Sequence, residues 1–213
     1  MTSSSGCAPV VPDWRTYSRD SLSPILEGAL SCFVEQGYHG TPIRVIAGRA
    51  GLSVPGLYHH YTSKQALLVA IVSHAMTELW ERSNAALDEA GDDVASRFDV
   101  LVECLVLFHA HRRELAFIAA SEIRGLVGQA GTDHIAARDR QQRLMDAVVD
   151  QGVAQGVFAT PLPLEVSRAV ITMCTGVAQW YRQGGPLPPA ELARDYCVIA
   201  RMAVGCVASE AIE

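Results

Sequence analysis

The chain has 213 residues, 49% of them hydrophobic, and carries 17 Lys and Arg residues against 23 Asp and Glu residues, a formal net charge of −6. An acidic protein of this kind has no broad basic field for nucleic acid, so any DNA binding must rest on a few placed contacts. No apolar run approaches the roughly 18 residues that a membrane span needs. The length suits one large domain, or a small head joined to a larger body with a sizeable core.

The N-terminal segment MTSSSGCAPVVPD is rich in Ser and Pro and lacks the charged and apolar stretches of a signal peptide. We therefore expect a disordered leader over residues 1–18 and a cytoplasmic protein. Arg15 and Arg19 in this leader could add an arm to a phosphate backbone, or they could only keep a disordered tail in solution. Six cysteines are scattered along the chain without a C-x-x-C pair, which predicts reduced thiols in the core. They are Cys7, Cys32, Cys104, Cys174, Cys197 and Cys206.

The segment TPIRVIAGRAGLSVPGLYHHYTSK, residues 41–64, has the turn and capping residues of two short helices joined by a tight corner. Thr41 can cap the first helix through its hydroxyl, while Pro42 takes the first helical position, where a missing N–H costs nothing. Gly51 permits the left-handed backbone conformation that ends this helix. An apolar face at helical spacing lies between these two ends. It consists of Ile43, Ile46, Ala47 and Ala50.

The second short helix is marked by Ser53 as its N-cap, by Pro55 in its first turn and by Leu57, which can hold it against the first helix. Two such helices are typical of a helix-turn-helix, whose second helix inserts its N-terminal end into the major groove of DNA. Gly56 has no side chain and would let this helix approach the bases closely. An ordinary helical corner with solvated charges is the alternative, because short patterns of this kind recur by chance.

Around the corner, the candidate DNA-contacting residues are small, apolar or polar, with few charges among them. Arg44 could reach a guanine edge or a phosphate, and Lys64, the only lysine of the chain, follows the unit as a point charge for a phosphate. Residues 1–65 hold five basic and four acidic residues, so the head is close to neutral while the body is acidic. The candidate set is Thr41, Arg44, Ser53, Val54, Pro55, Gly56, Tyr58, His59, His60 and Lys64.

The segment from Ser21 to about Ile71 resembles the N-terminal domain of the TetR family of bacterial transcriptional repressors, through FVEQGYHGTPIRVIAGRAGLS, LYHHY and SKQALLVAIV. The resemblance implies an all-α fold of about nine helices. It implies a three-helix helix-turn-helix domain over residues 19–65 and a ligand-binding and dimerisation domain over residues 66–213. It also implies a ligand-responsive repressor of a double-stranded, palindromic operator. In the resembled family phosphates would be met by Thr41, Tyr58, His60 and Lys64, and bases by Arg44, Val54, Pro55 and Gly56.

After the head, the chain is predicted to form helices separated by short breaks, because no stretch alternates as half-buried strands do. We expect these helices over residues 64–90, 94–111, 113 toward 127, and 133–155. Two further helices lie on either side of QGGPLPP, and each carries an apolar stripe with spacings of four and three. The stripes consist of Val166, Val170, Met173, Val177, Trp180, Leu192, Tyr196, Ile199, Ala203 and Cys206. Apolar residues off the stripes are Ile171, Cys174, Ala178, Val198, Met202 and Val204.

A helix that is apolar on two faces is buried from two directions. One face can pack on its own subunit and the other on a second copy, which gives an isologous four-helix interface. We place the stripes inward and the other residues toward the partner, although the two faces could be reversed. A fully internal helical hairpin is the alternative. A homodimer suits DNA binding because it holds two recognition helices about 34 Å apart, one turn of the duplex.

In the resembled family the body holds a small-molecule pocket whose occupation changes the spacing of the two heads. Large side chains of the body could line such a cavity with three polar anchors, or they could be plain core and surface. The candidates are Phe98, Leu101, Leu105, Phe108, Phe117, Glu122, Arg140, Met145, Met173, Cys174, Gln179 and Trp180. The stretches RDRQQRLMDAVVDQGVAQGVF and QWYRQGGPL resemble actinobacterial members that regulate steroid, fatty-acid and other acyl-CoA catabolism, which implies an acyl-CoA or lipid-like effector.

Enzyme and metal functions have little support in the sequence. The chain lacks a G-x-S-x-G elbow, a P-loop and a G-x-G-x-x-G motif. His74 and Glu78 share a helix face, but they lack a third and a fourth ligand. We therefore expect no catalysis, metal or cofactor. The competing hypothesis is a helical protein-interaction module that does not bind DNA, which would have no reason to keep the polar set from Arg44 to Lys64.

Overall fold

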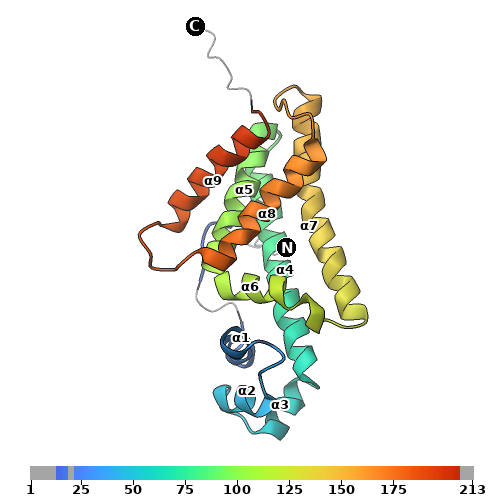
Figure 1. Cartoon of the computed structure of the whole chain (residues 1–213), viewed down its shortest axis with the longest axis vertical. Helices are drawn as coiled ribbons and strands as arrows, with labels where there is room; N and C mark the ends of the chain where they lie inside the picture. The colour runs from blue at the N-terminus through green and yellow to red at the C-terminus, as the bar shows by residue number, and fades with distance from the viewer. Residues whose placement is uncertain (1–12, 19–21, 207–213) are drawn as a thin grey trace, which may run out of the picture.

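The computed structural model describes residues 13–18 and 22–206. Over these residues the protein is all-α, as predicted, with nine α-helices, one 3-10 helix (η1) and an isolated bridge between Phe158 and Cys206 in place of any strand. Three short helices form a head at one end, and α4 runs from this head into the body (Figure 1). The elements are α1 (Pro24–Gln36), α2 (Ile43–Arg49), α3 (Val54–His60), α4 (Lys64–Ala90), α5 (Val94–His111), α6 (Arg113–Ser121), η1 (Ile123–Gly125), α7 (Gln129–Ala154), α8 (Pro163–Trp180) and α9 (Pro189–Ala203).

The corner of the helix-turn-helix forms as the sequence predicts. Gly51 has a φ of 69°, which turns the chain after α2. The Ser53 hydroxyl accepts a hydrogen bond from the backbone N–H of Gly56 at 3.1 Å, so it is the N-cap of α3. Leu57 is fully buried and holds α3 in the head. These local signals therefore fix the orientation of α3.

The start of α2 differs from the prediction. The helix begins at Ile43, with Pro42 at the N-cap position and no side-chain cap. Thr41 is buried, and its hydroxyl donates to the carbonyl oxygens of Gly37 at 2.7 Å and Cys32 at 3.1 Å. The predicted capping role of Thr41 is wrong, because its hydroxyl donates to carbonyl oxygens of α1 and of the residue that follows it, instead of accepting from the first N–H groups of α2.

The bounds of α4 and α5 match the prediction, whereas α6 is shorter than expected. It ends at Ser121 and is followed by η1. A Cβ atom at Gly125 would lie 2.9 Å from Leu68 and 3.0 Å from Tyr38, so this turn packs closely against α4 and the head.

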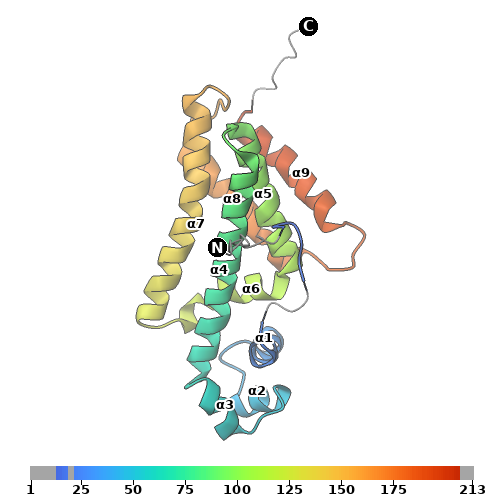
Figure 2. The same cartoon turned by 180° about the vertical axis from the view of Figure 1, so that it is seen from behind.

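The start of α7 also differs. The helix begins at Gln129, four residues earlier than predicted, because Gly128 alone makes the break with a φ of 63°. Gly131 lies inside the helix. In the view from behind, α4 runs along the length of the body between α5 and α7 (Figure 2). No helix within residues 13–18 and 22–206 is long and apolar enough to cross a membrane.

Residues 13–18, which we call the N-terminal strap, pack on α4 and α5. Trp14 is 2% exposed, and its indole N–H donates to Glu89 at 2.7 Å. Arg15 forms ion pairs with Glu89 at 2.7 Å and Glu103 at 2.8 Å. The prediction of a disordered leader is therefore wrong for the strap, and Arg15 is bound to the body instead of reaching toward DNA. Residues 1–12, which include Cys7, and Arg19 lie outside the described residues.

Two arginines of the body fasten the strap. Arg82 donates to the carbonyl oxygen of Trp14 at 2.7 Å, and Arg112 donates to that of Ser18 at 2.7 Å. Both guanidinium groups also bind the carboxylate of Glu78, at 2.8 and 3.0 Å. Because each arginine joins this carboxylate to a strap carbonyl, Glu78 is the centre of a network that connects α4, α5 and the strap.

The cysteines of the described residues are unpaired thiols. Cys32, Cys104 and Cys174 are buried, as predicted, whereas Cys197 and Cys206 are half-buried. Burial raises the pKa of the Cys104 thiol to about 12, so this group is neutral in the core.

Candidate functional site

The outer face of α3 presents most of the candidate DNA-contacting residues on one surface. Leu57 points into the head, so the opposite side of the short helix faces outward. Tyr58 is 44% exposed. The other exposed candidates of this face are Ser53, Pro55, His59 and His60, and Val54 and Gly56 are half-buried. This arrangement leaves the first turn of α3 accessible to a large ligand.

The two arginines of α2 differ in their partners. Arg49 forms a two-pronged ion pair with Glu35, at 2.5 and 2.8 Å. Arg44 is exposed and has no ion-pair partner among residues 13–18 and 22–206. Because its charge is not neutralised by the head, Arg44 is the better cation of the two for an external phosphate or base.

A glycine is favoured at position 56 for a structural reason as well as for the predicted close approach to DNA. A Cβ atom at this position would lie 3.2 Å from the Ser53 hydroxyl oxygen, closer than an ordinary contact. Substitution would therefore disturb the N-cap of α3 as well as the surface that faces outward.

Lys64 and Thr41, which are predicted to contact phosphates, form hydrogen bonds within the head. The Lys64 ammonium donates to the carbonyl oxygens of Tyr38 at 2.7 Å, Thr41 at 3.0 Å and His39 at 3.4 Å. It also lies 4.6 Å from the centre of the Tyr38 ring. An ammonium has three N–H donors, and all three have acceptors here. Lys64 thus ties the start of α4 to the loop between α1 and α2.

A cavity of about 540 Å³ lies in the body between α4, α5, α6, α7 and α8. Its apolar wall includes Leu79, Leu105, Phe108 and Ile171. Arg138, Asp139, Arg168 and Thr172, which are exposed, stand where the cavity meets the surface. The remaining lining residues are Ala75, Met76, His109, Ala116, Ala119, Ala120, His134, Ile135, Gln141, Gln142 and Thr175. The volume suits a small organic ligand.

Polar side chains are buried in the wall of this cavity. His109 donates from Nδ1 to the carbonyl oxygen of Leu105 at 2.7 Å, and burial lowers its pKa to about 4. His134 is 5% exposed, and neither ring nitrogen has a hydrogen-bond partner among the described residues. Burial and the charge of Arg138 lower the pKa of His134. Both imidazoles are therefore neutral near pH 7 and available for hydrogen bonds to a ligand.

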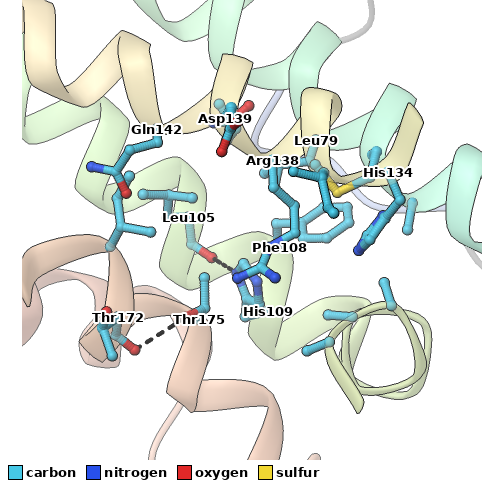
Figure 3. Close-up of a pocket in the computed structure, with 18 of the residues that line it drawn as sticks. Leu79, Leu105, Phe108, His109, His134, Arg138, Asp139, Gln142, Thr172 and Thr175 are labelled. Carbon is cyan, nitrogen blue, oxygen red and sulfur yellow. Dashed lines mark hydrogen bonds between the residues drawn. The ribbon is translucent and has the colours of Figure 1, made fainter. Parts of the chain in front are cut away.

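Figure 3 shows Arg138 extending from α7 toward the cavity, whose wall also contains His109 and Thr175. Within the described residues, neither Arg138 nor Arg168 has an ion-pair partner. Two arginines without acidic partners beside an apolar wall favour a ligand that has both an apolar part and a negative charge.

Comparison with known proteins connects these two sites. Residues 25–71 match the family model described as "Bacterial regulatory proteins, tetR family", and residues 91–204 match "Tetracyclin repressor-like, C-terminal domain". The chain belongs to the TetR family. It is a DNA-binding transcriptional regulator with a helix-turn-helix head and a C-terminal ligand-binding and dimerisation domain.

Relatives and solved structures of the TetR family cover most of the chain. The HTH-type transcriptional repressor KstR2 of Mycobacterium tuberculosis is 28% identical over 177 residues, which is 82% of this chain and 88% of the relative. The solved structure of KstR2 of Mycobacterium tuberculosis is 25% identical, with a TM-score of 0.79, and the match covers 86% and 94% of the two chains. PfmR from Thermus thermophilus is 30% identical, with a TM-score of 0.78 and coverage of 84% and 97%.

In this TetR-family regulator, Leu105 and Phe108 are the two predicted pocket residues that line the large cavity. Arg140 lines a second cavity of about 250 Å³, and its guanidinium group lies 4.4 Å from the centre of the Trp80 ring. Glu122 lies near the head, where it accepts a hydrogen bond from the N–H of Tyr38 at 3.5 Å. The polar anchors expected for the large cavity are therefore elsewhere.

The other predicted pocket residues belong to the core or the surface. Phe98 fills the core, with its ring centre 5.2 Å from that of Phe158. Trp180 is exposed at the end of α8. Three of them are buried outside the cavity: Leu101, Met145 and Cys174. Met173 is half-buried, and Phe117 and Gln179 are exposed.

The polar half of the cavity was missed, although α7 contains a signal for it. Met145, Val148 and Gly152 form the buried stripe in the second half of this helix. The same face continues backward through Gln141 and His134, which are buried polar residues. A polar segment that extends an apolar stripe in register indicates buried polar groups that need partners. The polar composition of the first half of α7 does not identify these groups. They are identified by the helical spacing that places His134 and Gln141 on the same face as Met145 and Val148.

The outer face of α8 and α9 agrees only in part with the predicted dimer interface. Val198 and Met202 are 59% and 77% exposed, as expected for residues that face a partner. Trp180 and Ile199, predicted to face inward, are 52% and 49% exposed. Val204, predicted to face the partner, is fully buried. Cys174 and Ala178, also predicted to face the partner, are buried, because α8 packs this side on α5 and α7.

His74 and Glu78 do not form an isolated metal-like pair. The His74 Nε2 atom lies 3.7 Å from Glu78, but the two oxygens of this carboxylate are already bonded to Arg82 and Arg112. Residues 13–18 and 22–206 contain no group of three or more His, Cys, Asp or Glu side chains placed to hold a metal ion.

Proposed function

We propose that this TetR-family regulator is a homodimeric repressor that binds a palindromic operator through α3. It leaves the operator when an anionic, lipid-like molecule such as an acyl-CoA fills the cavity. The observation that carries this proposal is the course of α4. This helix forms part of the cavity wall through Ala75, Met76 and Leu79, and its first residue, Lys64, holds the head loop.

A 27-residue helix is about 40 Å long, so a small rotation at the cavity becomes a larger displacement at the head. Two heads of a dimer must keep their recognition helices about 34 Å apart to enter successive major grooves. A ligand lowers operator affinity only if it binds the DNA-incompatible spacing more tightly. The contact of the cavity with α4 supplies a physical route for that preference.

The apolar and cationic walls of the cavity support the effector class. An acyl or ring system would lie against Leu79, Leu105 and Phe108, while its anionic group would meet Arg138 or Arg168. A CoA group would extend through the opening beside the two arginines. The relatives named KstR2 are repressors, which favours repression over activation.

The exposed apolar residues of α8 and α9 support the dimer. Trp180, Val198, Ile199 and Met202 are all about half exposed or more in the single chain. A second copy that packs the same face against them would bury this patch by an isologous contact.

A mobility-shift assay with DNA from beside the protein's own gene tests the DNA-binding part. We expect wild-type protein to shift this DNA and Arg44→Ala to weaken the shift about 10-fold, because a hydrogen bond from a charged donor is lost. Arg143→Ala is the matched control, since Arg143 is an exposed arginine of α7 that does not line the cavity. No binding by any of the three proteins would favour a protein-interaction module, whereas equal binding by all three would show that Arg44 does not contact the DNA.

A titration of the protein–DNA complex tests the effector part. Octanoyl-CoA and octanoate are added to wild-type, Arg138→Ala and Arg143→Ala protein, with CoA alone as the control ligand. We expect an acyl compound to release the DNA and Arg138→Ala to need about 10-fold more of it, whereas Arg143→Ala should match wild type. Release by CoA alone would place the recognised group outside the apolar cavity.

We also infer that this regulator acts without catalysis and in the cytoplasm. In the part of the chain that the structure describes, no Ser or Cys side chain lines the cavity beside the buried histidines, and the hydroxyls of Thr172 and Thr175 donate to carbonyl oxygens of α8. The proposed target, bacterial operator DNA, lies in the cytoplasm. Hydrolysis of octanoyl-CoA by the purified protein would contradict the first inference.

A further inference from the structure

His109 presents a hydrogen-bond acceptor to the cavity. Its Nδ1 atom lies 2.7 Å from the carbonyl oxygen of Leu105, one turn earlier on α5. A carbonyl oxygen can only accept, so Nδ1 must carry the proton. Burial lowers the pKa of the ring to about 4, which keeps His109 neutral near pH 7. Its other nitrogen, Nε2, is then a bare lone pair on a ring that lines the cavity (Figure 3).

Gln141 offers a second acceptor in the same wall. Its amide nitrogen donates to the hydroxyl of Ser83 at 2.8 Å. The amide oxygen is buried and has no hydrogen-bond partner among the described residues. Gln141 is 6% exposed, so its orientation is set by α4 and α7 and not by solvent.

Two threonines of α8 also offer the cavity acceptors and no donors. Thr172 donates its hydroxyl to the carbonyl oxygen of Arg168 at 2.7 Å, and Thr175 donates its hydroxyl to that of Thr172 at 3.1 Å. Each hydroxyl hydrogen is therefore used inside the helix, and only oxygen lone pairs remain for a ligand. His134 can donate from one nitrogen and accept at the other, so it does not change this bias.

We propose that the effector carries a hydroxyl group on its apolar part, and that this hydroxyl donates to Nε2 of His109 while Arg138 holds the anionic group. The inference rests on the proposed effector function of the cavity and deepens it. A carbonyl, ether or carboxylate oxygen against Nε2 would set two lone pairs against each other. A plain alkyl chain would displace water from an acceptor and leave it unpaired, which costs binding free energy. The effector class is thus a hydroxylated lipid-like acid or its thioester.

Matched ligand pairs that differ by one hydroxyl test this proposal. The probes are decanoate with 10-hydroxydecanoate, hexadecanoate with 16-hydroxyhexadecanoate, and 5β-cholanoate with its 3α-hydroxy derivative. Binding to wild-type protein is measured by calorimetry. We expect the hydroxylated member of at least one pair to bind about 5- to 10-fold more tightly, the advantage of one hydrogen bond made in place of one unmade.

Variants of His109 separate a direct hydrogen bond from a packing effect. His109→Phe fills a similar space without an acceptor, so we expect the preference for the hydroxyl to disappear. The plain member should bind at least as tightly as to wild type, because no acceptor is left unpaired. His109→Gln keeps an acceptor and should restore part of the preference. Thermal unfolding and circular dichroism show whether each variant is folded, and a His109→Phe protein that does not fold leaves the His109→Gln comparison to decide.

Three outcomes would overturn the inference: no pair favours its hydroxylated member, the preference survives in His109→Phe, or no probe binds at all. The first two leave the proposed function intact if plain acids still release DNA in the mobility-shift assay. Failure of every probe to bind, with operator binding unaffected by octanoyl-CoA, would overturn the effector cavity together with this inference. Operator binding itself is measured without ligand, so the two failures are distinguishable.

Discussion

Substitution of Lys64 distinguishes a structural role from a phosphate contact. The ammonium donates to the carbonyl oxygens of Tyr38, His39 and Thr41, at 2.7, 3.4 and 3.0 Å. Hydrogen bonds of a charged donor contribute about 1.5–3 kcal/mol each when fully buried, and this site is half-buried. We therefore expect Lys64→Ala to lower the stability of the head by about 2 kcal/mol in total.

The same substitution should leave the electrostatics of DNA binding nearly unchanged. Each phosphate contact adds about 0.9 to the slope of log affinity against log salt concentration. Because Lys64 is bonded inside the head, the slope of Lys64→Ala should equal that of wild type, with a weaker affinity that reflects the destabilised head. Arg44→Ala is the control, since Arg44 is exposed and lacks an ion-pair partner among the described residues.

Mobility shifts at several salt concentrations and thermal unfolding give the two quantities for each variant. For Arg44→Ala we expect unchanged unfolding and, if the side chain meets a phosphate, a slope lower by about 0.9. A Lys64→Ala protein with wild-type stability and a reduced slope would refute the structural role. It would show that the ammonium leaves the carbonyl groups and binds a phosphate when DNA is present.

Three further predictions concern the body. Between pH 6.5 and about 4 the unfolded chain protonates at His109 while the folded chain stays neutral there. Stability to urea should therefore fall over this window by up to about 3 kcal/mol more in wild type than in His109→Phe. Met202→Asp should give folded monomers in sedimentation, because the Met202 side chain is 77% exposed in the single chain. Val204→Asp should instead unfold the body, as measured by circular dichroism, because Val204 is fully buried. A Met202→Asp protein that remains a dimer would place the interface elsewhere. Trp14→Ala should lower the melting temperature and expose the strap to proteolysis, because loss of this buried side chain lowers the stability by about 3 kcal/mol. A Trp14→Ala protein as resistant to protease as wild type would contradict that packing.

Local signals explain which parts of the fold were predictable. The left-handed Gly51, the Ser53 cap and the ends of α4 depend on residues within four positions of each other, so the sequence pattern contains them. The sequence predicts phosphate contacts for Thr41 and Lys64 because Thr41 lies just before α2 and Lys64 lies just after α3. In this structure Lys64 binds carbonyl groups 23 to 26 residues away along the chain, which no local pattern predicts. Thr41 donates backward to the carbonyl oxygen of Gly37, and the local pattern did not distinguish this bond from a forward cap of α2.

The position of the cavity depended on packing that the sequence does not encode locally. Phe98 and Phe108 have the same residue type and lie on the same helix, yet Phe98 packs on Phe158 and Phe108 lines the cavity. Which large apolar residue meets empty space depends on where α7 and α8 separate. The polar residues His134 and Gln141 were the better guide, because buried polar groups without protein partners mark a place for water or a ligand.

The cavity and the N-terminal strap meet α4 at adjacent residues. Leu79 lines the cavity, whereas its neighbour Glu78 binds Arg82 and Arg112, the two side chains that hold the strap carbonyls. A ligand that displaces α4 at Leu79 must therefore move the Glu78 network with it or break it. Partly buried ion pairs of this kind are expensive to break when one partner is left behind. Movement of α4 together with the strap is the less costly response.

This coupling bears on how the head can respond to a ligand. Lys64 ties the head to the start of α4, and the strap ends at Ser18, six residues before α1 begins at Pro24. The head is thus attached to the body through Lys64 at the start of α4, and through its contacts with α6 and η1, where Glu122 accepts a hydrogen bond from the N–H of Tyr38. A displacement that reaches both attachments carries the head as a unit, because Lys64 also joins α4 to the loop after α1. The recognition helix can then change its distance from that of a second copy without any change inside the head.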